Sequence, residues 1–155
     1  MSRGKQANKI QRSPDPIYKS KVISKVVNMV MLDGKKSIAK TIINSMMDGL
    51  SEDKKESRKL FEDAVKNVMP NVEVRGKRIG GANYQIPVPL KHDRAETLAL
   101  RWIIQVARNK KGKPMWEKLM DEIKLACNKE GGAMKKRIDT HRMADANKAF
   151  SHFKW

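Results

Sequence analysis

Hydrophobic residues recur every three or four positions along most of this chain, which is the spacing of helices that bury one face. The first such stretch follows Ser20, a residue suited to cap a helix. Asp33-Gly34 is expected to end this helix, with Gly34 as the first residue beyond it. A second helix is predicted from about Lys35. Its expected buried face consists of Ala39, Ile42, Ile43, Met46 and Leu50.

Four more helices are predicted by the same criterion. A charged linker is expected over residues 52–57, and the third helix follows it and ends before Pro70. The fourth helix, over residues 94–110, has the clearest apolar face, and Pro114 opens the fifth at a position where proline is tolerated. Gly131-Gly132 stops the fifth helix, and the last is predicted over residues 133–150.

Residues 72–90 alternate instead, as a pair of strands does. Hydrophobic residues occupy every second position on either side of Gly80-Gly81, a dipeptide that accepts the positive φ of a tight hairpin turn. Pro87 and Pro89 cannot donate ladder hydrogen bonds and suit an exposed edge, and Pro89 leaves the length of the second strand open. Because an isolated two-stranded hairpin is only marginally stable in water, its tip is expected to move until a partner holds it.

These elements predict a mainly α fold, a six-helix domain with a protruding two-stranded β-hairpin between the third and fourth helices. A chain of 155 residues is expected to form a single domain, residues 1–155. Residues 1–13 are basic and form either a solvated tail or an arm that nucleic acid orders. The aromatic residues of the tail, 151–155, either pack on the domain or contact another protein.

Charge is the strongest sign of function. Lysine and arginine number 34 against 17 acidic residues, and the resulting net charge of +17 favours a polyanionic partner. No stretch approaches the roughly 18 apolar residues of a membrane-spanning helix. Cys127 is the only cysteine, which excludes an intrachain disulfide and favours a small buried hydrophobe. The N-terminus has no apolar signal segment, so we expect the cytoplasm or an organelle that makes its own proteins.

The chain shows no pattern of an active site. Its three histidines, His92, His141 and His152, lie far apart without metal-binding spacing, and no nucleophile motif is present. The run GKKS at 34–37 lacks the upstream glycine of a phosphate-binding loop, because position 29 is methionine. Most acids sit among lysines on polar helix faces, as surface ion pairs do. The sequence therefore indicates a binding protein rather than an enzyme, with no cofactor and no metal site.

Four runs together resemble one family, the bacterial-type small-subunit ribosomal protein seven. They are DPIYKSKVISKVVNMVMLDGKKSIA, RGKRIGGANYQIPVPL, ALRWIIQVARNKKGKPM and HRMADANKAFSHFKW, and the resemblance covers essentially the whole chain. It implies a structural constituent of the small ribosomal subunit that binds the 3′ major domain of its rRNA directly and nucleates assembly of the head. It also implies a place near the decoding centre and exit-site tRNA, in the bacterial cytoplasm or in an organellar ribosome.

Basic residues supply the expected rRNA contacts, some through charge clustering and others through the family's pattern. These positions are Arg3, Lys9, Lys35, Lys36, Arg75, Lys77, Arg78, Arg94, Arg101, Arg108, Lys110, Lys111, Lys113, Lys135 and Lys136. Three of the arginines recur every seven residues on the fourth helix and line one stripe, for which phosphate contact is favoured over a merely solvated face.

The resemblance assigns a second surface, at the hairpin tip and the last helix, to exit-site tRNA and the mRNA path. Its residues are Arg78, Gly80, Gly81, Asn83, Tyr84, Arg142 and Met143. Tyr84 either stacks on an unpaired base or packs on the hairpin's own face. Phe153 and Trp155 are expected to contact protein eleven of the small subunit, and protein nine is a further expected neighbour.

The mechanism expected from this pattern is physical. Basic side chains displace counterions from RNA phosphates, and specificity comes from the shape of a folded junction. Mg²⁺ is expected on the RNA only, since the chain has no acidic cluster to hold it. Three alternatives stay open: a DNA-binding architectural protein, a regulator that binds its own mRNA, and an RNA-modifying enzyme.

Overall fold

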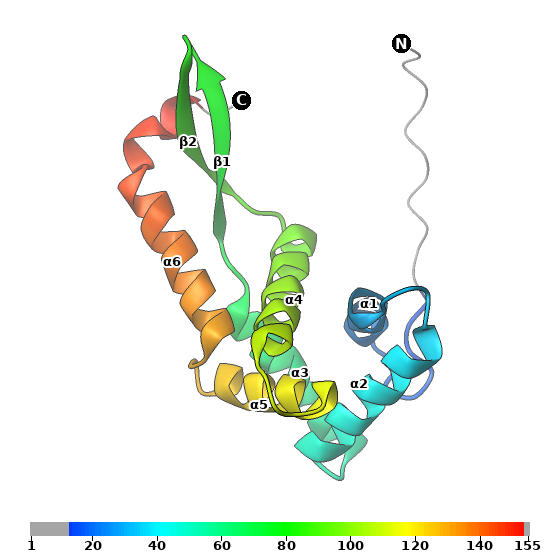
Figure 1. Ribbon diagram of the computed structural model, residues 1–155. Coiled ribbons are helices and arrows are strands. Elements are labelled where there is room, and N and C mark those ends of the chain that lie inside the picture. The colour runs from blue at the N-terminus through cyan, green and yellow to red at the C-terminus, as the bar shows by residue number, and fades with distance from the viewer. Residues whose placement is uncertain (1–12, 154–155) are drawn as a thin grey trace, which may run out of the picture.

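The computed structural model describes residues 13–153, and its elements follow the predicted order (Figure 1). They are α1 (Lys21–Val30), α2 (Lys36–Leu50), α3 (Lys54–Val68), β1 (Val72–Ile79), β2 (Ala82–Pro89), α4 (His92–Asn109), α5 (Met115–Cys127), α6 (Gly132–Ala146) and the 3₁₀ helix η1 (Lys148–Phe153). The prediction of a mainly α fold with a hairpin between the third and fourth helices is confirmed.

One hydrophobic cluster joins α1–α5 and the start of α6. α4 lies in the middle and contacts α1, α3, α5 and α6, as Figure 1 shows. The predicted apolar faces point inward: Ile43, Phe61 and Ile103 are each no more than 2% exposed. Since a fully buried aliphatic or aromatic side chain contributes about 1.5–3 kcal/mol, this cluster fixes the platform from which the other elements project.

The end of α1 differs from the prediction. The helix stops at Val30, and Met31 is extended, with φ −57° and ψ 135°. Asp33 and Gly34 both have positive φ, 50° and 73°, in a turn that lies beyond the helix, so Gly34 is not its terminating residue. Ser20 does occupy the N-cap position, but its hydroxyl donates to Glu62 Oε1 at 2.9 Å instead of capping.

The predicted charged linker is partly helical. Asp53 accepts a hydrogen bond from the backbone N–H of Lys55 at 3.0 Å, and this side-chain cap starts α3 at Lys54. The last helix is shorter than predicted. α6 ends at Ala146, where the Asn147 side chain donates to the Met143 carbonyl at 2.8 Å, and the chain continues as η1.

The hairpin projects from the helical body, with α6 running alongside it (Figure 1). Gly80 and Gly81 have φ of +57° and +88°, the two positive values that a type I′ turn requires. β2 extends through both prolines, and Pro89 pairs with Val72, so Pro89 does not shorten the strand.

The register divides the hairpin into two faces, because directly paired residues point to the same side. Lys77 pairs with Tyr84, and Arg75 pairs with Ile86, which is 2% exposed. Arg78 pairs with Asn83 on the other face, and both are exposed. The three basic residues predicted near the tip are therefore split between a packed face and an open one.

Candidate nucleic-acid interface

The turn between α1 and α2 presents Lys35 and Lys36 to solvent. Backbone hydrogen bonds shape the turn: Lys35 N donates to the Leu32 carbonyl at 2.9 Å and Lys36 N to the Gly34 carbonyl at 2.8 Å. Both lysines are exposed, as predicted for a basic corner. Leu32 is 61% exposed beside them, so this corner carries an apolar surface as well as charge.

The three arginines of α4 are all exposed, but two are held by other parts of the chain. Arg108 Nη2 donates to the carbonyl of Val30, the last residue of α1, at 3.2 Å. This bond ties the end of α4 to the segment that leads into the basic corner. Arg94 donates to Glu73 at the base of the hairpin, with Nε and Nη2 each 3.2 Å from Oε2. Arg101 lies between them.

The loop after α4 carries three of the predicted lysines. Lys113 Nζ lies 2.9 Å from Asp121 Oδ2, and that carboxylate raises the pKa of Lys113 above its ordinary value. Lys111 is exposed. Lys110 Nζ lies 2.7 Å from Glu122 Oε2 as an ion pair, although the angle is not that of a hydrogen bond. Two of the three lysines are therefore already in intramolecular ion pairs in the absence of RNA.

Glu122 is a fully buried carboxylate with 0% exposure. Its Oε1 accepts a hydrogen bond from the backbone N–H of Ala133 at 2.8 Å, in the first turn of α6. A carboxylate at this position satisfies an unpaired helix N–H and favours the positive end of the helix dipole. Gly131 has φ +95°, and a Cβ there would lie 2.9 Å from Glu122 Oε1, so glycine is required both by conformation and by space.

Glu73 joins the base of the hairpin to α4. This carboxylate is 8% exposed, and its Oε1 accepts from Arg75 Nε at 2.6 Å while its Oε2 accepts from Arg94. The guanidinium groups remain about half exposed, with side-chain exposures of 60% for Arg75 and 47% for Arg94. Glu73 therefore positions two predicted RNA contacts without removing them from solvent.

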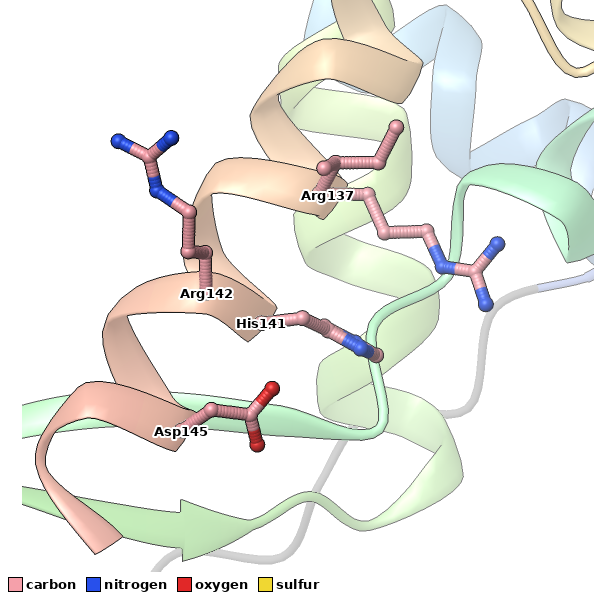
Figure 2. Close-up of a pocket in the computed structure, with 5 residues that line it drawn as sticks. Arg137, His141, Arg142 and Asp145 are labelled. Carbon is pink, nitrogen blue, oxygen red and sulfur yellow. The ribbon is translucent and has the colours of Figure 1, made fainter.

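α6 holds the entry to the hairpin on one side and is open on the other. Arg137 Nη1 donates to the Asn67 carbonyl at 2.7 Å, and the backbone N–H of Asn71 donates to His141 Nε2 at 3.2 Å. Figure 2 shows Arg137 and His141 pointing toward the segment between α3 and β1, while Arg142 points away from it. An open groove of about 460 Å³ lies on this part of α6, lined by Arg137, Ile138, His141, Arg142 and Asp145.

The remaining basic residues of α6 differ in the same way. Lys136 Nζ donates to Gln105 Oε1 of α4 at 2.6 Å, whereas Lys135 is exposed. Met143 is 47% exposed and lies on α6 as predicted. Predicted contacts of residues 1–12 and 154–155, namely Arg3, Lys9 and Trp155, fall outside the described residues.

The predicted basic positions thus fall into two groups. Within residues 13–153, one group has side chains with no intramolecular hydrogen bond or ion pair: Lys35, Lys36, Arg78, Arg101, Lys111, Lys135 and Arg142. The other group is held by partners from the same chain: Arg75, Arg94, Arg108, Lys110, Lys113 and Lys136. Lys77 is half-buried and also has a partner, so it does not belong to the first group. The first group can bind phosphate without breaking a contact.

Tyr84 and Phe153 make contacts within the chain. The Tyr84 ring centroid lies 5.2 Å from that of Phe150 and 5.6 Å from that of Phe153. Tyr84 thus packs against η1 and not on the hairpin's own face, and stacking on an unpaired base stays a prediction. For the tail, Phe153 packs on the hairpin, and contact with another protein stays a prediction.

The acidic and metal-ligating side chains of the described residues form no metal centre. Among residues 13–153, no three His, Cys, Asp or Glu side chains gather where they could hold a metal ion. In the same part of the chain, no helix is both long and apolar enough to cross a bilayer. Glu73 and Glu122, the two buried glutamates, both accept hydrogen bonds and lie beside cations.

Comparison with known proteins decides the family. A family model described as ribosomal protein S7p/S5e matches residues 2–148. This chain belongs to that family. Small ribosomal subunit protein uS7 of Pelotomaculum thermopropionicum is 54% identical over 143 residues, 92% of each chain. The proteins of the same name from Thermotoga neapolitana and Streptococcus suis are 48% and 46% identical, and cover 99% and 100% of each chain.

Membership confirms the resemblance seen in the sequence and sets the class of function. The family is structural and non-enzymatic, and the chain is a small-subunit ribosomal protein that associates with rRNA and other ribosomal proteins.

Sequence reasoning missed the residues that hold this surface in place. Glu73, Glu122 and Arg137 were not singled out, and His141 was considered only as a metal ligand, although each bonds another part of the fold. A signal existed for Glu122, because it lies three positions after Leu119 and four before Ala126, on the inward face of a helix where a carboxylate needs a partner.

Proposed function

We propose that the chain binds the 3′ major domain of small-subunit rRNA directly and nucleates assembly of the subunit head. The contact surface consists of the corner of Lys35 and Lys36, the exposed arginines of α4 and the loop over residues 110–113. The bond from Arg108 to the Val30 carbonyl supports this grouping, since it joins α4 to the segment leading into the corner. Folded rRNA is recognised through the shape of its backbone, which suits a surface of fixed cations.

The unpaired cations carry this proposal. Lys35, Lys36, Arg101 and Lys111 have no intramolecular partner among the described residues, in a chain with net charge +17. Each phosphate that one of them neutralises releases a condensed counterion and adds slightly under one unit to the slope of log affinity against log salt. The paired cations shape the surface and add to its positive field.

The test is the salt dependence of binding to a folded rRNA fragment of the 3′ major domain. Substitution of Lys36 by alanine is expected to weaken binding about equally on all RNA sequences and to reduce the salt slope by about 0.7–0.9. Lys59→Ala is the matched control, because Lys59 is an exposed lysine of α3 outside the proposed surface. An equal fall in slope for both variants would mean that net charge, not this surface, determines binding.

Competitors in the same assay separate the alternatives. Duplex DNA at equal concentration is expected to leave the rRNA complex intact, and displacement would favour the architectural DNA-binding protein. The chain's own mRNA competes only if it presents a similar fold, and such competition would add a regulatory role to the ribosomal one. Chelation of Mg²⁺ is expected to weaken binding only to the extent that the RNA fragment unfolds, since we place Mg²⁺ with the RNA alone.

We further infer that the hairpin tip faces exit-site tRNA and that the open side of α6 faces the mRNA path. Arg78 and Asn83 are exposed on the face of the hairpin opposite Tyr84, and Gly80-Gly81 ends the projection. On α6, Arg142 points away from the body of the protein (Figure 2). Proteins nine and eleven of the small subunit are the proposed neighbours, and the bacterial relatives support a cytoplasmic ribosome.

The tip can be shortened without changing the register. Deleting residues 78–79 and 82–83 leaves Gly80-Gly81 closed by the existing pair of Lys77 and Tyr84. Because the deletion also removes Arg78, we expect rRNA affinity to fall, but by less than in Lys36→Ala, and exit-site binding of deacylated tRNA to reconstituted subunits to fall severalfold. Equal loss of rRNA affinity in this variant and in Lys36→Ala would show that tip and corner are one site.

A further inference from the structure

Three aromatic rings from the hairpin and η1 form one cluster. Tyr84 and Phe150 meet edge to face, with centroids 5.2 Å apart and planes at 61°, and Phe153 lies 5.6 Å from Tyr84 at 42°. Phe150 and Phe153 lie 6.5 Å apart with nearly parallel planes, at 19°. These distances and angles are those of favourable aromatic pairs. All three residues are half-buried.

The cluster supports the hairpin close to its tip. Tyr84 pairs with Lys77, and only two further residue pairs separate it from the Gly80-Gly81 turn. The hairpin is also held nearer its base, where Arg137 and His141 hold the segment before β1 and Glu73 of β1 bonds Arg94 of α4. A two-stranded hairpin that was held only at its base would pivot, because such a ribbon is only marginally stable by itself. A second point of contact near the tip removes that freedom.

The contact is made by the end of the described chain. η1 contacts β2, while α6 contacts chiefly β1, so the two strands are supported from different segments. Figure 1 shows η1 at the end of α6, next to the hairpin. The direction of the hairpin therefore depends on how η1 continues from α6 at Asn147.

We propose that Phe150 and Phe153 are positioning residues that fix the direction of the hairpin tip through Tyr84. The contact fixes the tip before any RNA binds, so the conformational entropy lost when a ligand binds at the tip is smaller. The consequence for tRNA rests on the proposed function, but the contact between the rings does not.

The chain has two tyrosines, which makes a direct measurement possible. Fluorotyrosine labelling gives one ¹⁹F signal from Tyr84 and one from Tyr18, which is 5% exposed in the core and serves as an internal reference. In Phe150→Ala and Phe153→Ala we expect the Tyr84 signal to move toward its position in the denatured chain while the Tyr18 signal stays unchanged. Ser151→Ala is the matched control, because Ser151 is an exposed residue of η1.

Hydrogen exchange of the hairpin amides gives the second readout. Loss of one ring pair is expected to accelerate exchange in residues 77–84 by about three- to tenfold and to leave the amides of α4 unchanged. An unchanged Tyr84 signal with unchanged exchange in both phenylalanine variants would overturn the proposal. A Tyr84 signal in the unsubstituted protein that already matches the denatured chain would overturn it as well.

A third measurement connects the contact with function. Reconstituted subunits with Phe150→Ala are expected to bind exit-site tRNA severalfold more weakly, with rRNA-fragment affinity unchanged. If the rRNA fragment is not bound by the unsubstituted protein, the proposed function fails while the ¹⁹F result still decides the positioning role. If tRNA affinity is unchanged although Tyr84 has moved, the positioning role does not extend to tRNA, and the proposal is wrong on that point.

Discussion

Replacing Glu122 with glutamine is expected to destabilise the protein by about 2–3 kcal/mol. Removing one partner of a buried ion pair typically costs about 3–5 kcal/mol. Two features lower that range here: glutamine keeps an oxygen for the Ala133 N–H, and the Lys110 side chain is 35% exposed and can turn to solvent. For a domain of this size the loss corresponds to a fall in Tm of about 4–12 °C.

Urea unfolding followed by far-ultraviolet circular dichroism measures this cost. Glu130→Gln is the matched control, because Glu130 is an exposed glutamate in the connection between α5 and α6. Lys110→Met in the Glu122→Gln background is expected to recover about 1 kcal/mol or more, since the unpaired ammonium is then gone. If Glu122→Gln costs no more than Glu130→Gln, the carboxylate does not hold the start of α6, and the reasoning from burial is wrong.

Two substitutions and one reactivity measurement test the packing and electrostatics of the core. Burial, with a contribution from Asp48, raises the pKa of Tyr18 above its ordinary value of 10.0. The stability that the neutral Tyr18 contributes is therefore complete below pH 10.0 and is lost as the pH rises through the pKa of the folded state. In urea titrations between about pH 9 and 11, Tyr18→Phe should lose less stability than the unsubstituted protein. Gly49→Ala places a Cβ 2.8 Å from Met120 Sδ. In the same assay we expect this substitution to lower the free energy of unfolding by about 1 kcal/mol. An increase in that free energy would mean that Met120 moves freely to make room. Burial also raises the pKa of the Cys127 thiol, so a thiol reagent should react with native protein at least tenfold more slowly than with unfolded protein, and equal rates would contradict this.

The helical faces and the hairpin could be predicted because each follows from a local period. Ile43, Phe61 and Ile103 lie where a repeat of 3.6 residues places them, and Gly80-Gly81 adopts the φ values that its turn needs. These features depend on neighbours within a few positions. The family resemblance added the class of function, which spacing alone does not provide.

Contacts between distant residues could not be predicted in this way. Arg94 lies on a stripe of α4 that contains no acidic residue, yet its carboxylate partner Glu73 lies 21 residues away in β1. Lys110 likewise appears as one of a run of free lysines, although Glu122 neutralises it. The sequence shows that charges exist but not which ones are already paired. For a basic binding surface, that pairing decides which cations can meet a phosphate without losing a partner.

The two prolines of β2 matter most before the RNA is present. Pro87 and Pro89 lie within a ladder that remains intact, so the N–H groups they lack are those that would point to the outer edge of the strand. An outer edge that lacks these two donors is a poorer template for a third strand from another copy of the chain. Between synthesis and assembly, an unaccompanied chain with a projecting hairpin is at risk of edge-to-edge aggregation. Replacing both prolines with threonine would expose that risk as polymerisation during expression without the partner RNA.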